Sequence, residues 1–269
     1  MIGKRWNSFT PILVMFFLAT PGEARPKKAP QWKACSDRIL ECAGALDASC
    51  IEEWEGKLSA LGAQADPGVR ALLTSDNEVA VAAGLRVLQA IGGQPTADFA
   101  AGLLVQDDFD FKAQVAEGIG AFKGKIVVDA LAGLTSSRRP FEREKAVEAL
   151  GRVGDPSGID ALVVAAKDKF FSVRIKACEA MGRFDDKRVL EALGAALASD
   201  GNSGVRVAGA RALGETKARA AVPLLIVGLE DSSFTVQTAA YEALKSITKV
   251  DLGAAPDDWR SWLKRSNKK

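Results

Sequence analysis

The residues best suited to chemistry are charged side chains that recur in the second half of the sequence. They are Asp168, Arg174, Asp200, Arg206 and Asp231. Paired carboxylates can act as a general acid and a general base, and arginine can stabilise developing negative charge. Here, however, the same residue types return at intervals of about 31 residues, so they do not converge on one point. We therefore interpret them as structural residues, since an aspartate at a helix start caps exposed amides.

The 269-residue chain contains no histidine. This absence removes the Ser–His–Asp and Cys–His nucleophile pairs, the usual general base near neutral pH and all histidine-ligated metal sites. The sequence also has no phosphate-binding loop, dinucleotide-binding fingerprint, nucleophile elbow or calcium loop. We therefore expect a protein that is not an enzyme and that has no catalytic residue, cofactor or metal ion.

The charges of the chain nearly cancel. The 36 Lys and Arg residues face 34 Asp and Glu residues, which gives a net charge of +2. A dedicated nucleic-acid-binding protein gains its affinity by neutralising phosphates and has a clear positive excess. We therefore expect no nucleic-acid partner.

Basic and aromatic residues gather locally in two segments between expected helices. The candidate binding residues are Arg138, Arg139, Phe141, Lys167, Lys169 and Phe170. They would suit an anionic partner, such as an acidic protein surface or a polysaccharide. The acidic neighbours Glu142 and Glu144 leave an ordinary solvated edge as the other interpretation.

Another aromatic set recurs at one position of several units. Its members are Phe109, Phe171 and Phe234. A regular position of this kind predicts packing at the start of a helix. Phe141 and Phe170 fall outside the pattern and are the better candidates for exposure.

A repeat positions all of these residues. Six similar apolar segments end at intervals of 28 to 32 residues, and their last residues are Gly92, Gly120, Gly151, Gly182, Gly214 and Lys245. Each segment has helical apolar spacing and is followed by a short turn and a second apolar helix. A glycine at the end of a helix favours the left-handed conformation that caps it. Neither helix can bury its apolar stripe alone, so neighbouring pairs must stack.

The sequence therefore predicts an all-α fold, a right-handed α-α superhelix of about six helix pairs. We divide the chain into a signal peptide (1–24), an N-terminal helical cap with cysteines (25–65), the repeat array (66–250) and a C-terminal cap with a basic tail (251–269).

The repeat resembles a known family. Its pattern Asp-x4-Val-Arg-x2-Ala-x2-Ala-Leu-Gly is similar to the short HEAT-like repeats of bacterial HEAT-repeat proteins and phycobilisome lyase subunits. The units with Arg174 and Arg206 match best, Gln237 replaces the arginine in the last unit, and the first two units have Gly84 and Lys112 there. The resemblance implies that matching Asp and Arg residues bridge adjacent units.

The resemblance leaves several functions open, because one architecture hosts many tasks. The repeat, the expected export and the missing catalytic residues indicate a protein-interaction scaffold that offers the second helix of each unit to a protein or peptide. The alternative is a HEAT-like enzyme or enzyme subunit of the bilin lyase type, although export contradicts pigment assembly in the cytoplasm. Deoxyhypusine hydroxylase, another HEAT-like enzyme, requires histidine ligands for iron, which this chain lacks. A resemblance to HEAT-like DNA glycosylases would imply that the chain recognises nucleic acid, but its near-neutral net charge disfavours this function.

The first residues have the three parts of a secretory signal peptide. Lys4 and Arg5 are followed by a short apolar run over residues 12–19, and Gly22-Glu23-Ala24 is similar to a signal peptidase site. The apolar run is shorter than the ~20 residues that span a bilayer. We expect a periplasmic or secreted bacterial protein with no stable membrane insertion after cleavage near Ala24.

Three cysteines cluster after the expected signal peptide. A helical hairpin that folds about Leu46 brings Cys42 opposite Cys50, so Cys42–Cys50 is the preferred disulfide. Pairing of Cys35 with either of them is not excluded by the sequence. The fourth cysteine, Cys178, lies between apolar residues and is expected to be buried and inert.

The last residues predict a cap for the array. Trp259 and Trp262 are three residues apart and so lie on one face of a short helix. A terminal repeat without a cap would leave an apolar face in water.

Overall fold

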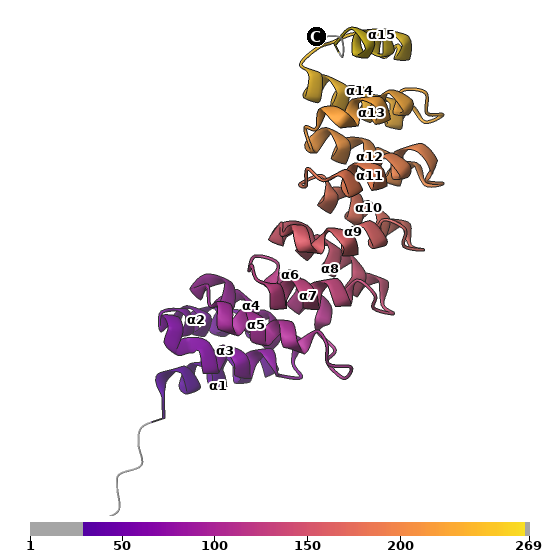
Figure 1. Cartoon of the computed structure of the whole chain (residues 1–269). Helices are drawn as coiled ribbons and strands as arrows, with labels where there is room; N and C mark the ends of the chain where they lie inside the picture. Colours follow the sequence, from indigo (N-terminus) through magenta and orange to yellow (C-terminus); the bar gives the residue numbers. More distant parts are fainter. Residues whose placement is uncertain (1–28, 267–269) are drawn as a thin grey trace, which may run out of the picture. The chain divides into compact units, whose positions relative to one another are not determined.

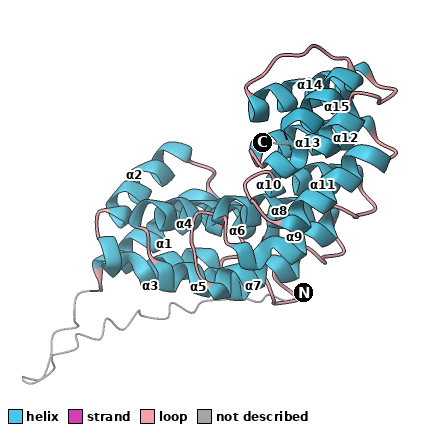
Figure 2. Cartoon of the chain, turned by 45° about the horizontal axis from the view of Figure 1, so that its top comes forward, coloured by secondary structure: helices cyan, strands magenta, loops and turns pink. Residues whose placement is uncertain are grey.

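The computed structural model describes residues 29–266, which form helices joined by loops and turns (Figures 1 and 2). This part of the chain contains fifteen α-helices, three short 3-10 helices and no strand. From Gln31 onwards the chain forms one compact unit. None of the helices within these residues has the length and apolar character needed to cross a membrane. The expected signal peptide (1–24) lies outside the described residues.

The helices alternate between two layers, and successive helices of a layer pack on one another, except that α7 meets the next repeat mainly through the 3-10 helix Pro156–Gly158. The first layer contains α2 (Ala48–Ser59), α4 (Glu78–Ile91), α6 (Lys112–Ile119), α8 (Pro140–Val153), α10 (Phe171–Met181), α12 (Ser203–Glu215) and α14 (Phe234–Thr248). The second layer contains α3 (Asp66–Leu73), α5 (Gln94–Leu103), α7 (Lys125–Leu134), α9 (Ile159–Ala165), α11 (Lys187–Ser199), α13 (Val222–Gly228) and α15 (Pro256–Ser266). The all-α solenoid predicted from the repeat is confirmed.

One continuous core runs between the layers. It includes residues from every helix, from Ile39 in α1 (Gln31–Gly44) to Trp259 in α15. Leu88, Leu131 and Leu150 are among its largest fully buried side chains. Each unit buries its apolar stripe against its neighbours, so the stability of every unit depends on the units beside it.

Polar side chains fix where several helices begin. Asn77 accepts hydrogen bonds from the amides of Val79 and Ala80 at the start of α4. Asn202 does the same for the first amides of α12, and Asp186 caps α11. Such caps satisfy the amides that have no partner within the helix.

The N-terminal cysteine segment is part of the array. Helices α1 and α2 form a hairpin, and a disulfide joins Cys42 to Cys50 across it, with the Cα atoms 5.8 Å apart. Cys35 and Cys178 are buried free thiols, and burial raises the pKa of Cys178 to about 12. Helix α2 packs on α4, and α3 packs on α5. Helices α2 and α3 therefore form one further helix pair, which precedes the six pairs expected from the sequence.

The repeated glycines do not have the role that the sequence suggests. Gly92 is left-handed with φ of 72° and caps α4, as expected. The expectation is wrong for the next four repeats, because Gly120, Gly151, Gly182 and Gly214 all have right-handed helical backbone. Their common feature is a close neighbour. A Cβ on each of them would lie 2.9 to 3.1 Å from the Cα of an alanine in the following first-layer helix. These glycines therefore set the spacing between successive helices of the first layer.

This spacing predicts opposite effects for one substitution at two helical sites. Gly151→Ala would place its Cβ 2.9 Å from the Cα of Ala180, so we expect the free energy of unfolding to fall by about 1–3 kcal/mol. Gly56→Ala, in the last turn of α2 with no heavy atom within 4 Å of its added Cβ, should raise the free energy of unfolding by about 0.5–1 kcal/mol. Urea denaturation of both variants checks the prediction. A stabilising Gly151→Ala would show that this contact is not tight.

Helix α15 closes the other end by packing on α13. The Trp259 side chain is fully buried, and its indole Nε1 donates a hydrogen bond of 2.7 Å to the carbonyl of Gly253. The Trp262 ring packs edge-on against it, with the ring centroids 6.2 Å apart. Both tryptophans therefore serve packing.

Candidate interaction edge

Three arginines link successive repeats in the same way, and we call this set the Arg–Asp ladder. Arg143, Arg174 and Arg206 each hold an aspartate of the following repeat with two nitrogens, and those aspartates are Asp168, Asp200 and Asp231. The paired N···O distances are 2.6 to 3.0 Å. The third nitrogen, Nη1, donates to a carbonyl of the loop before the arginine's own helix, at 2.8 to 2.9 Å. Each arginine therefore ties two consecutive loops together.

Each aspartate of the ladder also caps its own loop. Asp168 Oδ1 accepts a hydrogen bond from the amide of Phe170, and Asp200 and Asp231 accept equivalent bonds two residues along the chain. Hydrogen bonds from Arg174 and Arg206 hold the pKa values of Asp200 and Asp231 below their ordinary range. Charged carboxylates in these buried pairs are structural groups, so the bridging role predicted for them is confirmed.

The sequence pattern misses Arg143. Glu142 stands before it in place of the valine that precedes Arg174 and Arg206, so the motif is interrupted there. The spacing could have found it, because Arg143 precedes Asp168 by 25 residues, as Arg206 precedes Asp231. The ladder ends at Gln237, whose amide bonds the carbonyl of Asp231 but carries no charge.

The candidate binding residues lie on two loops that Arg143 connects. Arg138 and Arg139 belong to the loop before α8, and Lys167 and Lys169 belong to the loop before α10. Arg143 bonds the carbonyls of Ser137 and Arg138 on the first loop and the Asp168 carboxylate on the second. Its guanidinium carbon also lies 5.4 Å from the centre of the Phe170 ring. The structure therefore brings both groups of candidates to one edge of the array.

Exposed phenylalanines mark the same edge at the starts of first-layer helices. Phe141, Phe171 and Phe234 are 57%, 54% and 78% exposed, and Phe170 is 42% exposed. The expectation that Phe171 and Phe234 pack inside is wrong, because each is the first residue of its helix and lies beyond the contact with the next helix. Phe109 does pack, with its ring 6.0 Å from that of Phe111. We call Phe141, Phe170, Phe171 and Phe234 the phenylalanine edge.

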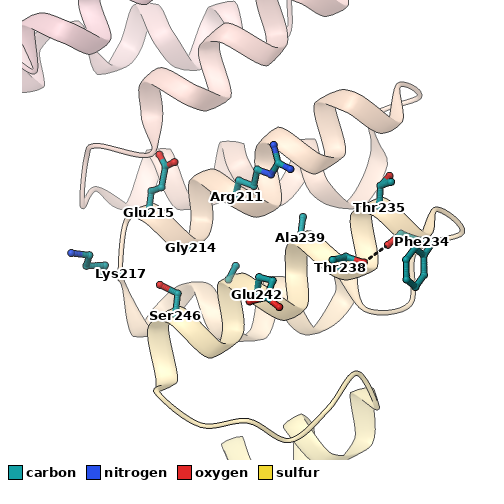
Figure 3. A pocket seen from close by; sticks show the side chains of 11 residues that line it. Arg211, Gly214, Glu215, Lys217, Phe234, Thr235, Thr238, Ala239, Glu242 and Ser246 are labelled. Atoms are coloured by element: carbon teal, nitrogen blue, oxygen red, sulfur yellow. Dashed lines mark hydrogen bonds between the residues drawn. The ribbon is translucent and has the colours of Figure 1, made fainter.

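A groove of about 670 Å³ begins beside Phe234 and runs between α12 and α14 (Figure 3). Its floor is made of small residues, Gly214, Ala239 and Ala243. Figure 3 shows Phe234 at one end of the groove and Lys217 and Ser246 at the other. A second hollow of about 730 Å³ lies between the loops before α6 and α8, and Arg138 and Arg139 line it.

The described residues include no group of three Cys, Asp or Glu side chains placed to hold a metal ion. The carboxylates that repeat along the edge are instead paired with arginines one by one.

The two-layer array and its ladder define an α-helical repeat protein of the solenoid class. The chain belongs to the HEAT-repeat family, because HEAT repeats match residues 96–169, 128–208 and 190–257. No curated protein sequence matches the chain.

Several solved structures are similar to this chain. The Escherichia coli protein YibA is similar, with 20% identity, a TM-score of 0.53 and coverage of 81% of this chain and 80% of YibA. The complex of CpcE and CpcF of phycocyanin lyase from Nostoc sp. PCC7120 matches with 16% identity and a TM-score of 0.42, over 93% of this chain and 99% of that one. Human deoxyhypusine hydroxylase matches with 19% identity and a TM-score of 0.43, over 81% and 89%. At these identities the likeness concerns the fold alone.

Proposed function

We propose that the protein is a non-enzymatic extracytoplasmic scaffold that binds a protein or peptide partner along the phenylalanine edge. The observation that carries this proposal is the exposure of Phe141, Phe171 and Phe234 near the first residues of the first-layer helices α8, α10 and α14. Soluble proteins place single apolar side chains on their surface without consequence, but several exposed aromatic rings along one edge indicate an interaction site.

The charges beside the phenylalanine edge support a protein partner. Lys169, which has no ion pair among the described residues, lies 5.5 Å from the Phe170 ring, and Lys145, which is paired with Glu117 and Glu148, lies 5.6 Å from the Phe141 ring. A surface that alternates aromatic rings and cations suits a segment with apolar and acidic side chains. The rigid loops that Arg143, Arg174 and Arg206 hold would present this surface with little loss of conformational freedom on binding.

Extracytoplasmic location is supported by two features. The pattern of Lys4, Arg5 and the apolar run over 12–19 is that of a secretory signal. The disulfide between Cys42 and Cys50 is of the kind that persists in oxidising compartments. Recovery of the protein from the cytoplasmic fraction of its host would contradict this part of the proposal.

The partner surface is tested with the double variant Phe141→Ser and Phe171→Ser. We expect at least a tenfold loss of crosslinked partner in the native host, because aromatic anchors carry much of the binding energy of an interface. The unfolding midpoint should change little, since both rings are more than half exposed. Crosslinking with identification of partners by mass spectrometry measures the loss.

Val164→Ser is the matched control, because Val164 is 68% exposed on α9 in the second layer. It should leave partner recovery unchanged. Loss of the partner with Val164→Ser and not with the phenylalanine variant would place the interface on the second-layer helices and overturn the proposed edge. Failure to recover any partner would overturn the scaffold function itself.

A further inference from the structure

The Arg–Asp ladder has a gap one repeat before its first pair. Lys112 occupies the position of Arg143, Arg174 and Arg206 in the preceding repeat, and Ser137 follows it by the same 25 residues that separate Arg143 from Asp168. The lysine thus faces a repeat in which serine replaces the aspartate. The ion pairs of the described residues include all three arginines of the ladder but not Lys112.

The loop that carries Ser137 already has the shape of the ladder loops. Ser137 Oγ accepts a hydrogen bond from the amide of Arg139 at 3.1 Å, as Asp168 Oδ1 does from the amide of Phe170 at 2.8 Å. The Ser137 carbonyl accepts from Arg143, as the Asp168 carbonyl accepts from Arg174. What this loop lacks, compared with the later repeats, is a carboxylate at position 137 itself, where the Ser137 hydroxyl donates to the Glu142 carboxylate instead.

The missing carboxylate leaves an open pocket. Lys112 is half-buried and lines the hollow of about 730 Å³ together with Arg138 and Arg139. Two acids also line it. Glu142 is already bound, because it accepts hydrogen bonds from Ser137 Oγ and Arg139 Nη1, and Asp107 is exposed at the rim. Of the three cations, Arg139 is paired with Glu142 and with Asp110, so Lys112 and Arg138 are the lining cations that have no ion pair among the described residues.

We propose that this pocket receives a glutamate or aspartate side chain of the protein partner. The incoming carboxylate pairs with Lys112 in the place that Asp168, Asp200 and Asp231 take in the later repeats. This inference rests on the proposed function, since it names the chemistry of the partner. A protein segment suits the pocket better than a polysaccharide because Val105, which is 70% exposed, and Phe109 offer apolar contacts beside the cations.

The probe for this proposal is a fluorescein-labelled peptide with blocked ends that contains two adjacent glutamates flanked by leucines. Fluorescence anisotropy with the full chain measures its affinity at low salt. We expect Lys112→Met to weaken binding about tenfold or more, because a charge-assisted hydrogen bond is lost. Lys249→Met, which removes an exposed lysine after α14, is the matched control and should leave the affinity unchanged.

A second pair of variants closes the gap within the protein itself. Glu142→Val restores the residue type of the later repeats and keeps the pocket open, so the peptide should still bind. Addition of Ser137→Asp supplies the missing carboxylate, and we expect this double variant to lose at least tenfold in affinity. Its thermal midpoint should lie above that of Glu142→Val, because the ladder gains an internal pair.

Several outcomes would overturn the proposal. The first is that Lys112→Met binds the peptide with the same affinity as the parent protein. The second is that a peptide with glutamines in place of the glutamates binds equally well. The third is that inorganic phosphate or glucuronate competes as effectively as unlabelled peptide. The Phe141→Ser and Phe171→Ser variant separates the two proposals. If the peptide binds through its glutamates but the phenylalanine variant recovers as much partner as the parent, only the proposed phenylalanine edge is contradicted. If partner recovery depends on the phenylalanines but does not change in Lys112→Met, only the proposed pocket is contradicted.

Discussion

Asp168→Ala is expected to lower the free energy of unfolding by about 3–5 kcal/mol, because it leaves a buried arginine without its counter-charge. The Arg143 side chain is 6% exposed and that of Asp168 is 12% exposed, and their closest N···O distance is 2.6 Å. The variant also removes the acceptor for the Phe170 amide. Chemical denaturation followed by circular dichroism measures the change.

Two control variants separate the buried pair from a general effect of losing an aspartate. Asp160→Ala removes a carboxylate that is 79% exposed and pairs with Arg188, so its effect should stay within about 0.5 kcal/mol. Combining Arg143→Met with Asp168→Ala should recover part of the lost stability, because no unpaired buried charge remains. An Asp168→Ala variant as stable as Asp160→Ala would show that the ladder contributes little.

The same pair makes stability depend on pH. Burial acts to raise the pKa of Asp168, but the hydrogen bonds from Arg143 and the Phe170 amide, with the Arg143 charge, hold it below its ordinary value of 3.8. The stabilisation from this carboxylate is therefore present above its unfolded pKa and is lost as the pH falls through its lower folded pKa. The difference in stability between the parent and Asp168→Ala should accordingly narrow in acid, below a pH of about 4.

Trp259→Ala is expected to cost about 3–5 kcal/mol, since it removes the largest fully buried side chain of the described residues. The indole fills the contact of α15 with the array and bonds Gly253. Because α15 is the last described helix, the loss should appear first as local opening. Hydrogen exchange should show loss of protection in α15 and then in α13, with α4 and α5 unaffected.

Trp262→Ala is the matched control for Trp259→Ala. The Trp262 ring is half-buried and contacts the Arg219 guanidinium, whose carbon lies 5.5 Å from the ring centre. We expect a smaller loss of stability, because less apolar surface is uncovered. Equal effects of the two variants would mean that α15 is held by the tryptophan pair as a whole.

The repeat period allowed the order and the pairing of the helices to be predicted from the sequence, because these features follow from residue types that recur at a fixed spacing. The bridging role of the aspartates was implied by the resemblance to HEAT-like repeats. The close approach at Gly151 was not predictable in this way, because a glycine near a helix end has the same appearance whether it serves as a cap or as a contact. Its role depends on Ala180, which lies in the next repeat.

The candidate edge was predicted less well than the fold. The sequence indicated only that Arg138 and Lys169 both lie between helices, and it did not indicate that they lie near each other. Arg143, which connects their loops, was missed because Glu142 interrupts the motif before it. The exposure of Phe171 and Phe234 depends on where each helix begins, and a shift of one residue at a helix start changes which way a side chain points. That Lys112 lacks an aspartate partner in the next repeat could be recognised only after the Arg–Asp pairs of the later repeats had been identified.

The shared loops of the Arg–Asp ladder couple each of its repeats to the repeats on both sides. The loop that Arg174 holds through the Asp168 carbonyl is also the loop that Arg143 holds through the Asp168 carboxylate, so opening one unit disturbs the bonds of both neighbours. This coupling extends from α8 to α14 and stops at Lys112. We therefore expect the repeats from α8 to α14, the stiff block, to open less readily than the repeats before α8, which have no Arg–Asp pair of the ladder. A partner that supplies a carboxylate to Lys112 would add one repeat to the stiff block. Binding of this partner would then make the repeat that contains Lys112 more rigid.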